Sequence, residues 1–500
     1  MSSTHFDVLI VGAGLSGIGS AYHLQTHCPD KTFAILEGRE TLGGTWDLFR
    51  YPGIRSDSDM YTLGFAFEPW QERKSIADGS DILHYLKETA QNYGIDKKIR
   101  FQHWVNRYSW SSDDATWTVE AKNKETGETV KYTSSFLINC SGYYRYDQGY
   151  TPEFRGVEKF KGQVIHPQHW PEDLDYENKR VVVIGSGATA VTLIPSMADK
   201  AEHVTMLQRS PTYILAQPDV DAVAHALNRF LPAKLAYQMT RWKKVAEQTF
   251  FYQFCRRFPN LARKILRARL RKSLGPNFDI DTHFNPSYKP WDQRLCLVPN
   301  GDLFRALRKG DASVETDHID TFTEKGIRLK SGKELEADIV VTATGLNLVA
   351  LGGAELVVDG KQLKLGDTMS FKGMMLSGVP NFAMIVGYTN ASWTLKSDLT
   401  GEHITRLLQY MDKHGYDYCA PQAPGNVQTE GFLDLNSNYV LRALDQLPKQ
   451  GDRAPWKLYQ NYALDLVNLR YGAVTDDALK FYRVPRLHAQ PQPTATRMAS

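Results

Sequence analysis

The chain of 500 residues lacks the features that mark disulfide-rich, zinc-binding and membrane-spanning proteins. Its five cysteines are scattered along the sequence, and no two of them form a Cys-x-x-Cys pair. Such a set argues against a disulfide framework, a cysteine-based zinc site and a dithiol reductase. No apolar run reaches the roughly 18 residues that cross a bilayer, and no basic-then-apolar leader precedes the first strand-like segment. We therefore expect no metal site, no membrane span and a cytoplasmic location.

An excess of one charge sign is also missing from the chain as a whole. The formal net charge is +3, from 59 Lys and Arg against 56 Asp and Glu, so the total does not call for a nucleic-acid partner. The length allows two or three domains with large cores, and the 42% content of apolar residues is typical of a globular chain.

A glycine-rich loop follows the first strand-like segment. Residues 6–11 are a short apolar run that predicts a buried parallel strand, and helical spacing begins after the loop. Gly12 permits a tight turn, Gly14 lets a pyrophosphate approach the backbone, and Gly17 lets the helix pack closely on the strand. Together with Ser16, these residues stand where a helix N-terminus offers free N–H groups to phosphate. The sequence predicts a dinucleotide site here.

An acidic residue distinguishes the ligand of this first site. Glu37 ends the second apolar run, 20 positions after Gly17. A carboxylate at that place accepts hydrogen bonds from ribose hydroxyls, and it disfavours a ribose 2′-phosphate. The first site should therefore hold FAD and not NADPH.

A second glycine-rich loop repeats the pattern after the apolar run 180–184. It consists of Gly185, Ser186, Gly187, Ala188, Thr189 and Ala190. The next apolar run ends in Arg209 and Ser210, with no acid. Arginine can pair with a 2′-phosphate and serine can donate to it, so this site should prefer NADPH. The alternative is that Arg209 is a solvated surface arginine.

The stretch between the two loops carries the most specific pattern. Residues 160–171 match FxGxxxHxxxWP through Phe160, Gly162, His166, Trp170 and Pro171. Taken alone, the stretch could be a surface loop, because glycine and proline break regular structure. With its flanks it resembles the Baeyer–Villiger monooxygenases, flavoenzymes that insert oxygen beside a ketone carbonyl.

Further stretches match the same family in family order. They are GGxW at 43–46, YPGxxxD at 51–57 and an acid–strand–Ala-Thr-Gly element at 338–345. Residues 50–64 and 290–299 are similar to the ethionamide-activating sub-type of the family.

The resemblance implies an oxidoreductase with FAD and NADPH. Such an enzyme inserts one oxygen atom from O2 into ketones through a C4a-peroxyflavin, giving esters or lactones, and also oxidises sulfides or thiocarbonyls. Its partners would be small-molecule ketones or sulfides and O2. A flavin-containing N- or S-monooxygenase without ketone activity remains the alternative; it shares both glycine loops but would lack the Trp170-Pro171 pair.

The resemblance also implies which side chains meet the cofactors. Asp57 would lie near the isoalloxazine and the nicotinamide, and Val105 would touch the adenine through its backbone. Four consecutive residues would line the flavin and two would face the NADP side: Thr45, Trp46, Asp47 and Leu48 for the former, Arg55 and Ser56 for the latter.

The loop 288–294 holds two candidates for the catalytic cation. Lys289 stands beside the proline that matches the family. Arg294 keeps its proton near neutral pH, so it is better suited to supply a permanent positive charge. We expect Arg294 to carry the role and Asp57 to orient it. We expect His166, in the linking stretch, to couple domain movement to oxygen transfer and not to donate a proton.

The expected fold is α/β, with two Rossmann-like dinucleotide-binding domains and a helical insert. The expected segments are FAD-binding at 1–149 and 375–484, NADP-binding at 150–221 and 276–374, a helical insert at 222–275 and a disordered tail at 485–500.

The insert has a local charge excess that the total conceals. Residues 222–275 contain thirteen Lys and Arg but one acid, Glu247. One interpretation is a helical insert with a solvated basic face. The other is a surface that meets anionic lipid, which would give the protein a peripheral membrane contact.

Overall fold

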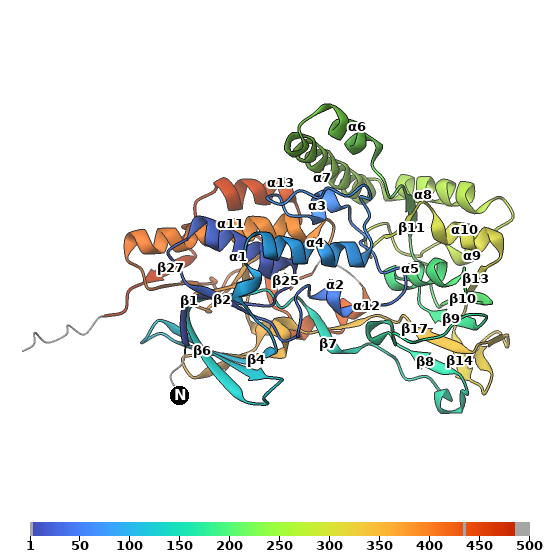
Figure 1. Cartoon of the computed structure of the whole chain (residues 1–500), viewed down its shortest axis with the longest axis horizontal. Helices are drawn as coiled ribbons and strands as arrows, with labels where there is room; N and C mark the ends of the chain where they lie inside the picture. Colours follow the sequence, from blue (N-terminus) through green and yellow to red (C-terminus); the bar gives the residue numbers. More distant parts are fainter. Residues whose placement is uncertain (1–3, 434–436, 486–500) are drawn as a thin grey trace, which may run out of the picture.

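Two separate sheets organise the chain (Figure 1). The computed structural model describes residues 4–433 and 437–485, so residues 486–500 of the expected tail lie outside the described residues. Within the described ranges, no helix has the length and apolar character to cross a membrane, and no cluster of side chains could hold a metal ion.

The larger sheet has nine strands in the order β20-β19-β4-β5-β6-β1-β2-β3, with β23 beside β6. β1 pairs in parallel with both β2 and β6, and Val8, Leu9 and Ile10 of β1 are fully buried, as expected for a parallel strand covered on both faces. The strands are β1 (Thr4–Val11), β2 (Phe33–Leu36), β3 (Ile99–Arg100), β4 (His103–Ser111), β5 (Thr116–Asn123), β6 (Thr129–Asn139), β19 (Glu355–Val358), β20 (Lys361–Leu363) and β23 (Phe382–Met384). Three long helices pack beside this sheet: α1 (Leu15–His27), α4 (Gly79–Asn92) and α11 (Trp393–His414).

The smaller sheet is parallel throughout, in the order β13-β10-β9-β17-β8. Its strands are β8 (Gln163–Ile165), β9 (Arg180–Ile184), β10 (His203–Gln208), β13 (Ala312–Thr316) and β17 (Ile339–Thr342), and its helices include α5 (Ala188–Met197) and α10 (Asp302–Lys309). Each sheet thus holds one strand, glycine loop and helix unit, and the expected α/β class with two Rossmann-like units is confirmed.

The chain crosses between the sheets twice, along the antiparallel pair β7 (Tyr144–Gly149) and β18 (Leu346–Leu348). It re-enters the larger sheet at Glu355, where β19 pairs with β4. The return therefore comes earlier than the expected boundary at 375. Leu356 and Val357 of β19 are buried in the core of the larger sheet, a tertiary contact that no local pattern announced.

His166 ties the linking stretch to both crossings. Its Nε2 donates to the Gly345 carbonyl at 3.1 Å, and its Nδ1 accepts from the Gln168 N–H at 3.2 Å. The ring also lies against Gly149, where an added Cβ would come within 2.0 Å of it. Burial lowers the pKa of His166, so the ring stays neutral near pH 7 and keeps one donor and one acceptor nitrogen.

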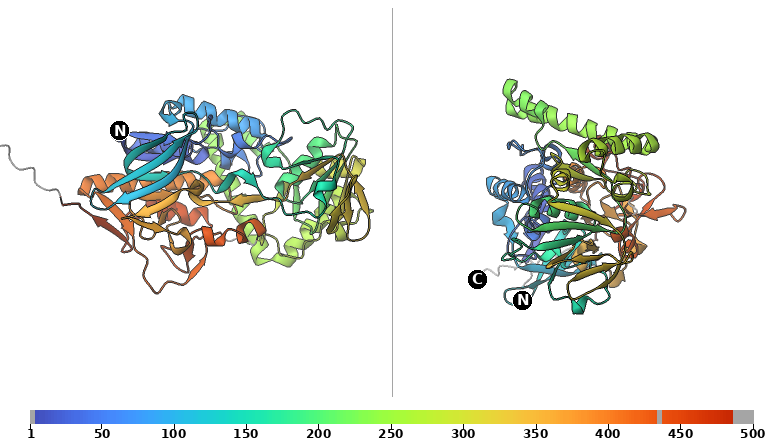
Figure 2. Two further views of the ribbon diagram at one scale, coloured as in Figure 1. Left: turned by 90° about the horizontal axis from the view of Figure 1, so that it is seen from below. Right: turned by 90° about the vertical axis from the view of Figure 1, so that its right-hand side faces the viewer.

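The segment 222–275 forms the expected helices, α6 (Ala222–Phe230), α7 (Ala233–Arg257) and α8 (Pro259–Leu274). α6 and α7 project beyond the two sheets in Figure 1, and the end-on view of Figure 2 shows the long helix standing out from the body. Not every basic side chain here faces solvent: Arg241 and Lys244 are buried against the body. The expected basic face is corrected to that extent.

We predict that Gly149→Ala lowers the free energy of unfolding by about 1–3 kcal/mol, because the new methyl group overpacks against the His166 ring. The measurement is the midpoint of thermal unfolding. Gly425→Ala is the matched control, since a Cβ there meets nothing within 4 Å. Adding His166→Ala to Gly149→Ala should recover part of the loss; equal midpoints for the two glycine variants would contradict the packing argument.

Candidate active site

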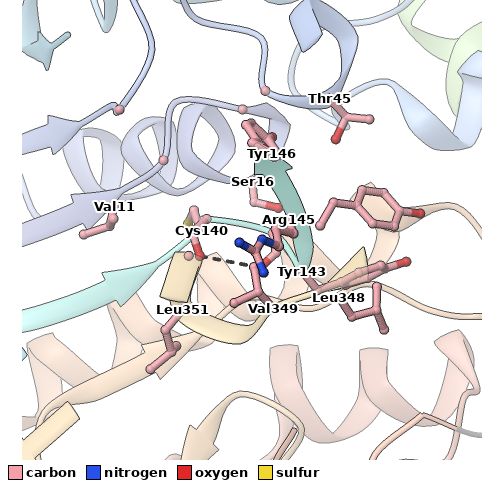
Figure 3. A pocket seen from close by; sticks show the side chains of 18 of the residues that line it. Val11, Ser16, Thr45, Cys140, Tyr143, Arg145, Tyr146, Leu348, Val349 and Leu351 are labelled. Carbon is pink, nitrogen blue, oxygen red and sulfur yellow. Dashed lines mark hydrogen bonds between the residues drawn. The ribbon is translucent and has the colours of Figure 1, made fainter. Parts of the chain in front are cut away.

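A cleft of about 1350 Å³ runs along the carboxyl ends of β1 and β2. It exceeds the roughly 300–1000 Å³ of an ordinary small-ligand pocket. Figure 3 shows Ser16 of α1 on one side, Tyr143, Arg145 and Tyr146 beside it, and Val349 and Leu351 on the facing segment. The residues of the first glycine loop, β7 and the segment after β18 therefore share one cavity.

The first glycine loop forms a tight turn at the head of this cleft. Gly12 has φ +102°, and a Cβ there would come within 2.5 Å of the Cys140 carbonyl oxygen. Gly14 then caps α1 with no side-chain hydrogen bond, so the first N–H groups of α1 are left for a ligand. Ser16 accepts a hydrogen bond from the Trp393 indole at 2.8 Å, which ties the loop to α11. Gly17 lies in the first turns of α1 and is buried.

Glu37 lines the same cleft at the end of β2. Its carboxylate accepts from the Ala13 N–H at 2.7 Å and from the Arg39 N–H at 2.9 Å. Burial raises the pKa of Glu37, and the two N–H donors oppose that shift. Each oxygen retains acceptor capacity toward the cleft.

Only some of the residues expected at the cofactors line the cleft. Those that line it are Thr45, Trp46, Ser56, Asp57 and Val105. Asp47, Leu48 and Arg55 are not among the lining residues. The flavin contacts expected of Asp47 and Leu48, and the NADP-side position expected of Arg55, stay predictions.

Asp47, Leu48 and Arg55 have partners within the protein. The Asp47 carboxylate accepts from Arg39 Nε at 3.2 Å and Arg50 Nη2 at 2.7 Å, and Leu48 packs in the core of the smaller sheet. Arg55 forms an ion pair with Asp302 at 2.5 Å. α2 (Thr45–Leu48) is a single helical turn, so its consecutive side chains point in different directions.

Arg294 and Asp57 form a two-point ion pair at the wall of the cleft. Arg294 Nη2 donates to Asp57 Oδ1 at 3.0 Å, and Arg294 Nε lies 2.9 Å from Asp57 Oδ2. The two side chains remain 37% and 34% exposed, so both face the cavity. The Asp57 charge raises the pKa of Arg294, against the opposing effect of burial, and the guanidinium stays positive.

Lys289 does not share this position. It is exposed and does not line the cleft, and its backbone N–H donates to Asp292 Oδ2 at 3.1 Å. Of the two cations weighed from the sequence, the structure brings Arg294 to the cleft.

Three tyrosines that line the cleft near Arg294 were not predicted from the sequence: Tyr143, Tyr144 and Tyr439. The Tyr143 ring lies 4.7 Å from that of Tyr144 and 5.2 Å from that of Trp393. Burial raises the pKa of all three, so their hydroxyls are neutral at neutral pH. The Tyr-Tyr pair, separated from the end of β6 by three residues, was a usable signal, because ligands bind at strand ends. Tyr439 is too distant in sequence to give one.

The second glycine loop lies at the start of α5. Gly187 caps α5 without a side-chain hydrogen bond, and the Ser186 hydroxyl lies 2.8 Å from that of Thr212. Gly185, Ala188, Thr189 and Ala190 complete this turn. No member of the loop is among the residues lining the large cleft.

A second arginine stands near the end of β10. Arg209 and Ser210 are exposed there, as expected for phosphate contacts. Arg442, which the sequence reasoning missed, lines the cleft and stacks on Tyr150, with its guanidinium carbon 3.5 Å from the ring centre. Burial and then the Arg209 charge lower the pKa of Arg442. An anion between them would relieve that repulsion.

Two Rossmann-like units beside one cleft, with an arginine fixed at its wall, define the class of the protein. It is an oxidoreductase built to bring two dinucleotides together.

Comparison with known proteins narrows this class. The sequence matches the family described as "Flavin-binding monooxygenase-like" over residues 66–351, and an NAD(P)-binding Rossmann-like domain over residues 10–73. It is 57% identical over 483 residues to the FAD-containing monooxygenase EthA of Mycobacterium tuberculosis (strain ATCC 25618 / H37Rv), covering 96% of this chain and 98% of that one. It is 51% identical to the probable FAD-binding monooxygenase AlmA of Acinetobacter baylyi, over 95% and 96% of the two chains. The chain belongs to the flavin-binding monooxygenase-like family.

Solved structures share the fold at low identity. An oxidised steroid monooxygenase bound to NADP superposes with a TM-score of 0.75 at 21% identity, covering 96% of this chain and 100% of that one. An open structure of cyclohexanone monooxygenase gives 0.75 at 19% identity, with the same coverage.

We predict that Arg209→Ala raises the Michaelis constant for NADPH roughly tenfold to a hundredfold, since a lost charge-assisted contact costs about 1.5–3 kcal/mol. The constant for NADH should stay nearly unchanged, because NADH has no 2′-phosphate. Initial-rate measurements with both coenzymes check this. Arg442→Ala tests the second cation in the same way, and an equal loss with NADH in the Arg209 variant would remove the assignment.

Proposed function

We propose that this protein is an FAD- and NADPH-dependent Baeyer–Villiger monooxygenase. It inserts one oxygen atom of O2 beside a ketone carbonyl, so that ketone, O2, NADPH and a proton give an ester or lactone, NADP+ and water. The single observation that carries this proposal is the Arg294–Asp57 pair, a permanent positive charge held at the wall of the cleft that the first glycine loop also lines.

The residues of the cleft fit a bound FAD. The turn at Gly12 and the free N-terminus of α1 suit a pyrophosphate, and Glu37 suits ribose hydroxyls. We assign FAD to the larger sheet for this reason. The flavin ring would lie toward Trp46 and Asp57, which line the cleft beyond the loop. When bound and reduced, the flavin supplies the oxygen chemistry.

NADPH is assigned to the smaller sheet. The turn at Gly185 and the open start of α5 suit its pyrophosphate, and Arg209 with Ser210 suits the 2′-phosphate. Arg442 lines the large cleft, and burial and then the charge of Arg209 lower its pKa, which supports a coenzyme that reaches from one site to the other.

Arg294 stabilises the negative charge that develops during oxygen transfer. A fixed cation in a partly enclosed site lowers the energy of a charged transition state without needing to reorient. Asp57 holds the guanidinium plane through two contacts, so the charge has a defined position. Tyr143, Tyr144 and Tyr439 keep their protons because burial raises their pKa values, so they add no negative charge beside Arg294.

A ketone is the proposed substrate class, with sulfides or thiocarbonyls as further acceptors of the same oxygen atom. The alternative enzyme for amines and sulfides would leave ketones unchanged. A panel of linear, cyclic and aryl ketones with a thioether, assayed for NADPH consumption and for products, decides between them. Sulfoxide formation with no ester from any ketone would favour the alternative.

Peripheral contact with a membrane is also proposed, through the helical segment 222–275. Its support is the excess of basic side chains in that segment.

We predict that Arg294→Ala lowers ester formation by roughly a hundredfold or more, the usual cost of losing one stabilising group at a transition state. NADPH should still be consumed, with hydrogen peroxide released in place of ester. Lys289→Ala is the matched control and should form ester at the normal rate. Both variants are checked for FAD content; normal ester formation by the Arg294 variant, with loss in the Lys289 variant, would transfer the role to Lys289.

We predict that His166→Ala keeps FAD bound but lowers the yield of ester per NADPH consumed. The ring lies outside the lining of the cleft, and its contacts join the linking stretch to the crossing segments at Gly149 and Gly345. Its loss should therefore disturb domain movement and not the chemistry itself. Product and peroxide yields give the measurement, and an unchanged ratio would leave His166 a purely structural residue.

A further inference from the structure

The outward face of α7 is apolar. Exposed residues recur at helical spacing along it, and the stripe consists of Leu235, Met239, Trp242, Ala246 and Phe250. Trp242 is 51% exposed and Phe250 is 73% exposed. Fifteen residues of α-helix rise about 22 Å, so the stripe is long enough to contact an extended surface.

The inward face of α7 mixes apolar side chains such as Tyr237 and Val245 with polar ones that bind the body of the protein. Arg241 Nη1 donates to the carbonyls of Tyr61 and Gly64, both at 2.8 Å, and Gln248 Nε2 donates to Asp59 at 2.7 Å. A surface helix ordinarily turns a polar face to solvent, whereas α7 leaves Met239, Trp242 and Phe250 exposed as well. The polar contacts hold α7 in place, and the exposed apolar side marks an interaction surface.

Neighbouring segments extend this surface. Val223 and Phe230 of α6 are exposed, and Phe230 is 79% accessible. Trp242 lies 5.9 Å from the ring of Tyr462 at the start of α13 (Tyr462–Asp465), so α13 adjoins α7. α13 exposes Leu464, and the segment that follows it exposes Val467 and Tyr471. In Figure 1, α6, α7 and α13 occupy the same margin of the molecule.

The charges beside the stripe indicate its partner. Arg229, Lys234 and Arg257 are exposed, and none has an acidic partner within residues 4–433 and 437–485. Glu247, the single acid of α6, α7 and α8, is neutralised by Lys243 and Lys244. Exposed apolar side chains flanked by unpaired cations are typical of helices that lie in an anionic lipid interface. A two-fold contact between copies would bring these like charges together.

We propose that the face formed by α6, α7 and α13 inserts shallowly into an anionic bilayer, and that the enzyme takes an apolar ketone from it. The substrate part of this inference rests on the proposed function. A small recess lies beneath α7, between Thr249 and Tyr252 on the helix and Ala391 and Tyr462 on the body. Ala391 also lines the large cleft, so the lipid-facing helix lies next to the reaction chamber.

Vesicle binding tests the docking face. The wild-type protein and the variant Met239→Ser/Trp242→Ser/Phe250→Ser are sedimented with vesicles of phosphatidylglycerol and phosphatidylcholine, and with phosphatidylcholine alone. Val157→Ser/Val164→Ser is the matched control, because it removes exposed apolar side chains from β8 and from the short 3-10 helix that precedes it, away from α7. Wild type and control should bind the anionic vesicles, and the triple variant should bind at least roughly tenfold more weakly. High salt should weaken wild-type binding without abolishing it, because insertion is not screened.

Two results would overturn the docking face. One is equal binding of anionic vesicles by the triple variant and the wild type. The other is a wild-type protein that does not bind anionic vesicles and elutes as a dimer while the triple variant elutes as a monomer, which would make the face a contact between copies. Thermal unfolding and FAD content confirm that the triple variant is folded.

Turnover separates this inference from the proposed function. The triple variant should oxidise a short, water-soluble ketone at the wild-type rate, and a long-chain ketone dissolved in anionic vesicles several-fold more slowly. Equal rates on the vesicle-borne ketone would refute delivery from the bilayer. Failure of the wild type on every ketone would instead refute the proposed function and leave the vesicle-binding result standing.

Discussion

The ion pair between Arg294 and Asp57 is the contact on which the arrangement of the cleft depends. Asp57 follows the first glycine unit of the larger sheet, whereas Arg294 comes from the segment leading into β12 (Cys296–Pro299) and the helix α10 of the smaller sheet. The pair therefore joins the two halves across the cavity. Because a partly enclosed charge is unfavourable without its partner, each side chain restrains the half of the protein that carries the other.

The two strands that cross between the sheets are held together by His166. β7 and β18 run side by side, and His166 holds the linking stretch against both of them. These two strands carry the chain between the units, and contacts such as Arg294–Asp57 and Arg55–Asp302 join the units as well. The proposed reaction would need the units to move against one another, because coenzyme and substrate would approach the same ring. The neutral His166 ring contributes hydrogen bonds without adding a charge at the crossing strands.

α7 shows that charge composition alone does not define a surface. The segment 222–275 has a large basic excess, yet Arg241 and Lys244 are buried in contacts with the body. Other basic side chains of the segment, such as Arg256 and Arg267, form ion pairs. What remains outside is an apolar stripe with a few free cations. Exposed apolar area and exposed charge act together at an interface, so their combined placement matters more than the count of either.

The sequence by itself determined the units of the fold. The apolar runs, the two glycine loops and the acid or arginine after each second strand are local, because backbone conformation and phosphate contacts depend on neighbouring residues. The tertiary structure decided the rest. It packed Leu48 in the core of the smaller sheet and paired Arg55 with Asp302, and it brought Tyr439 and Arg442 to the cleft from a distant segment. It placed Arg294, and not Lys289, beside Asp57 at the cleft, and it returned the chain to the larger sheet at Glu355. These outcomes depend on which distant segments pack together, and no window of local sequence contains that information.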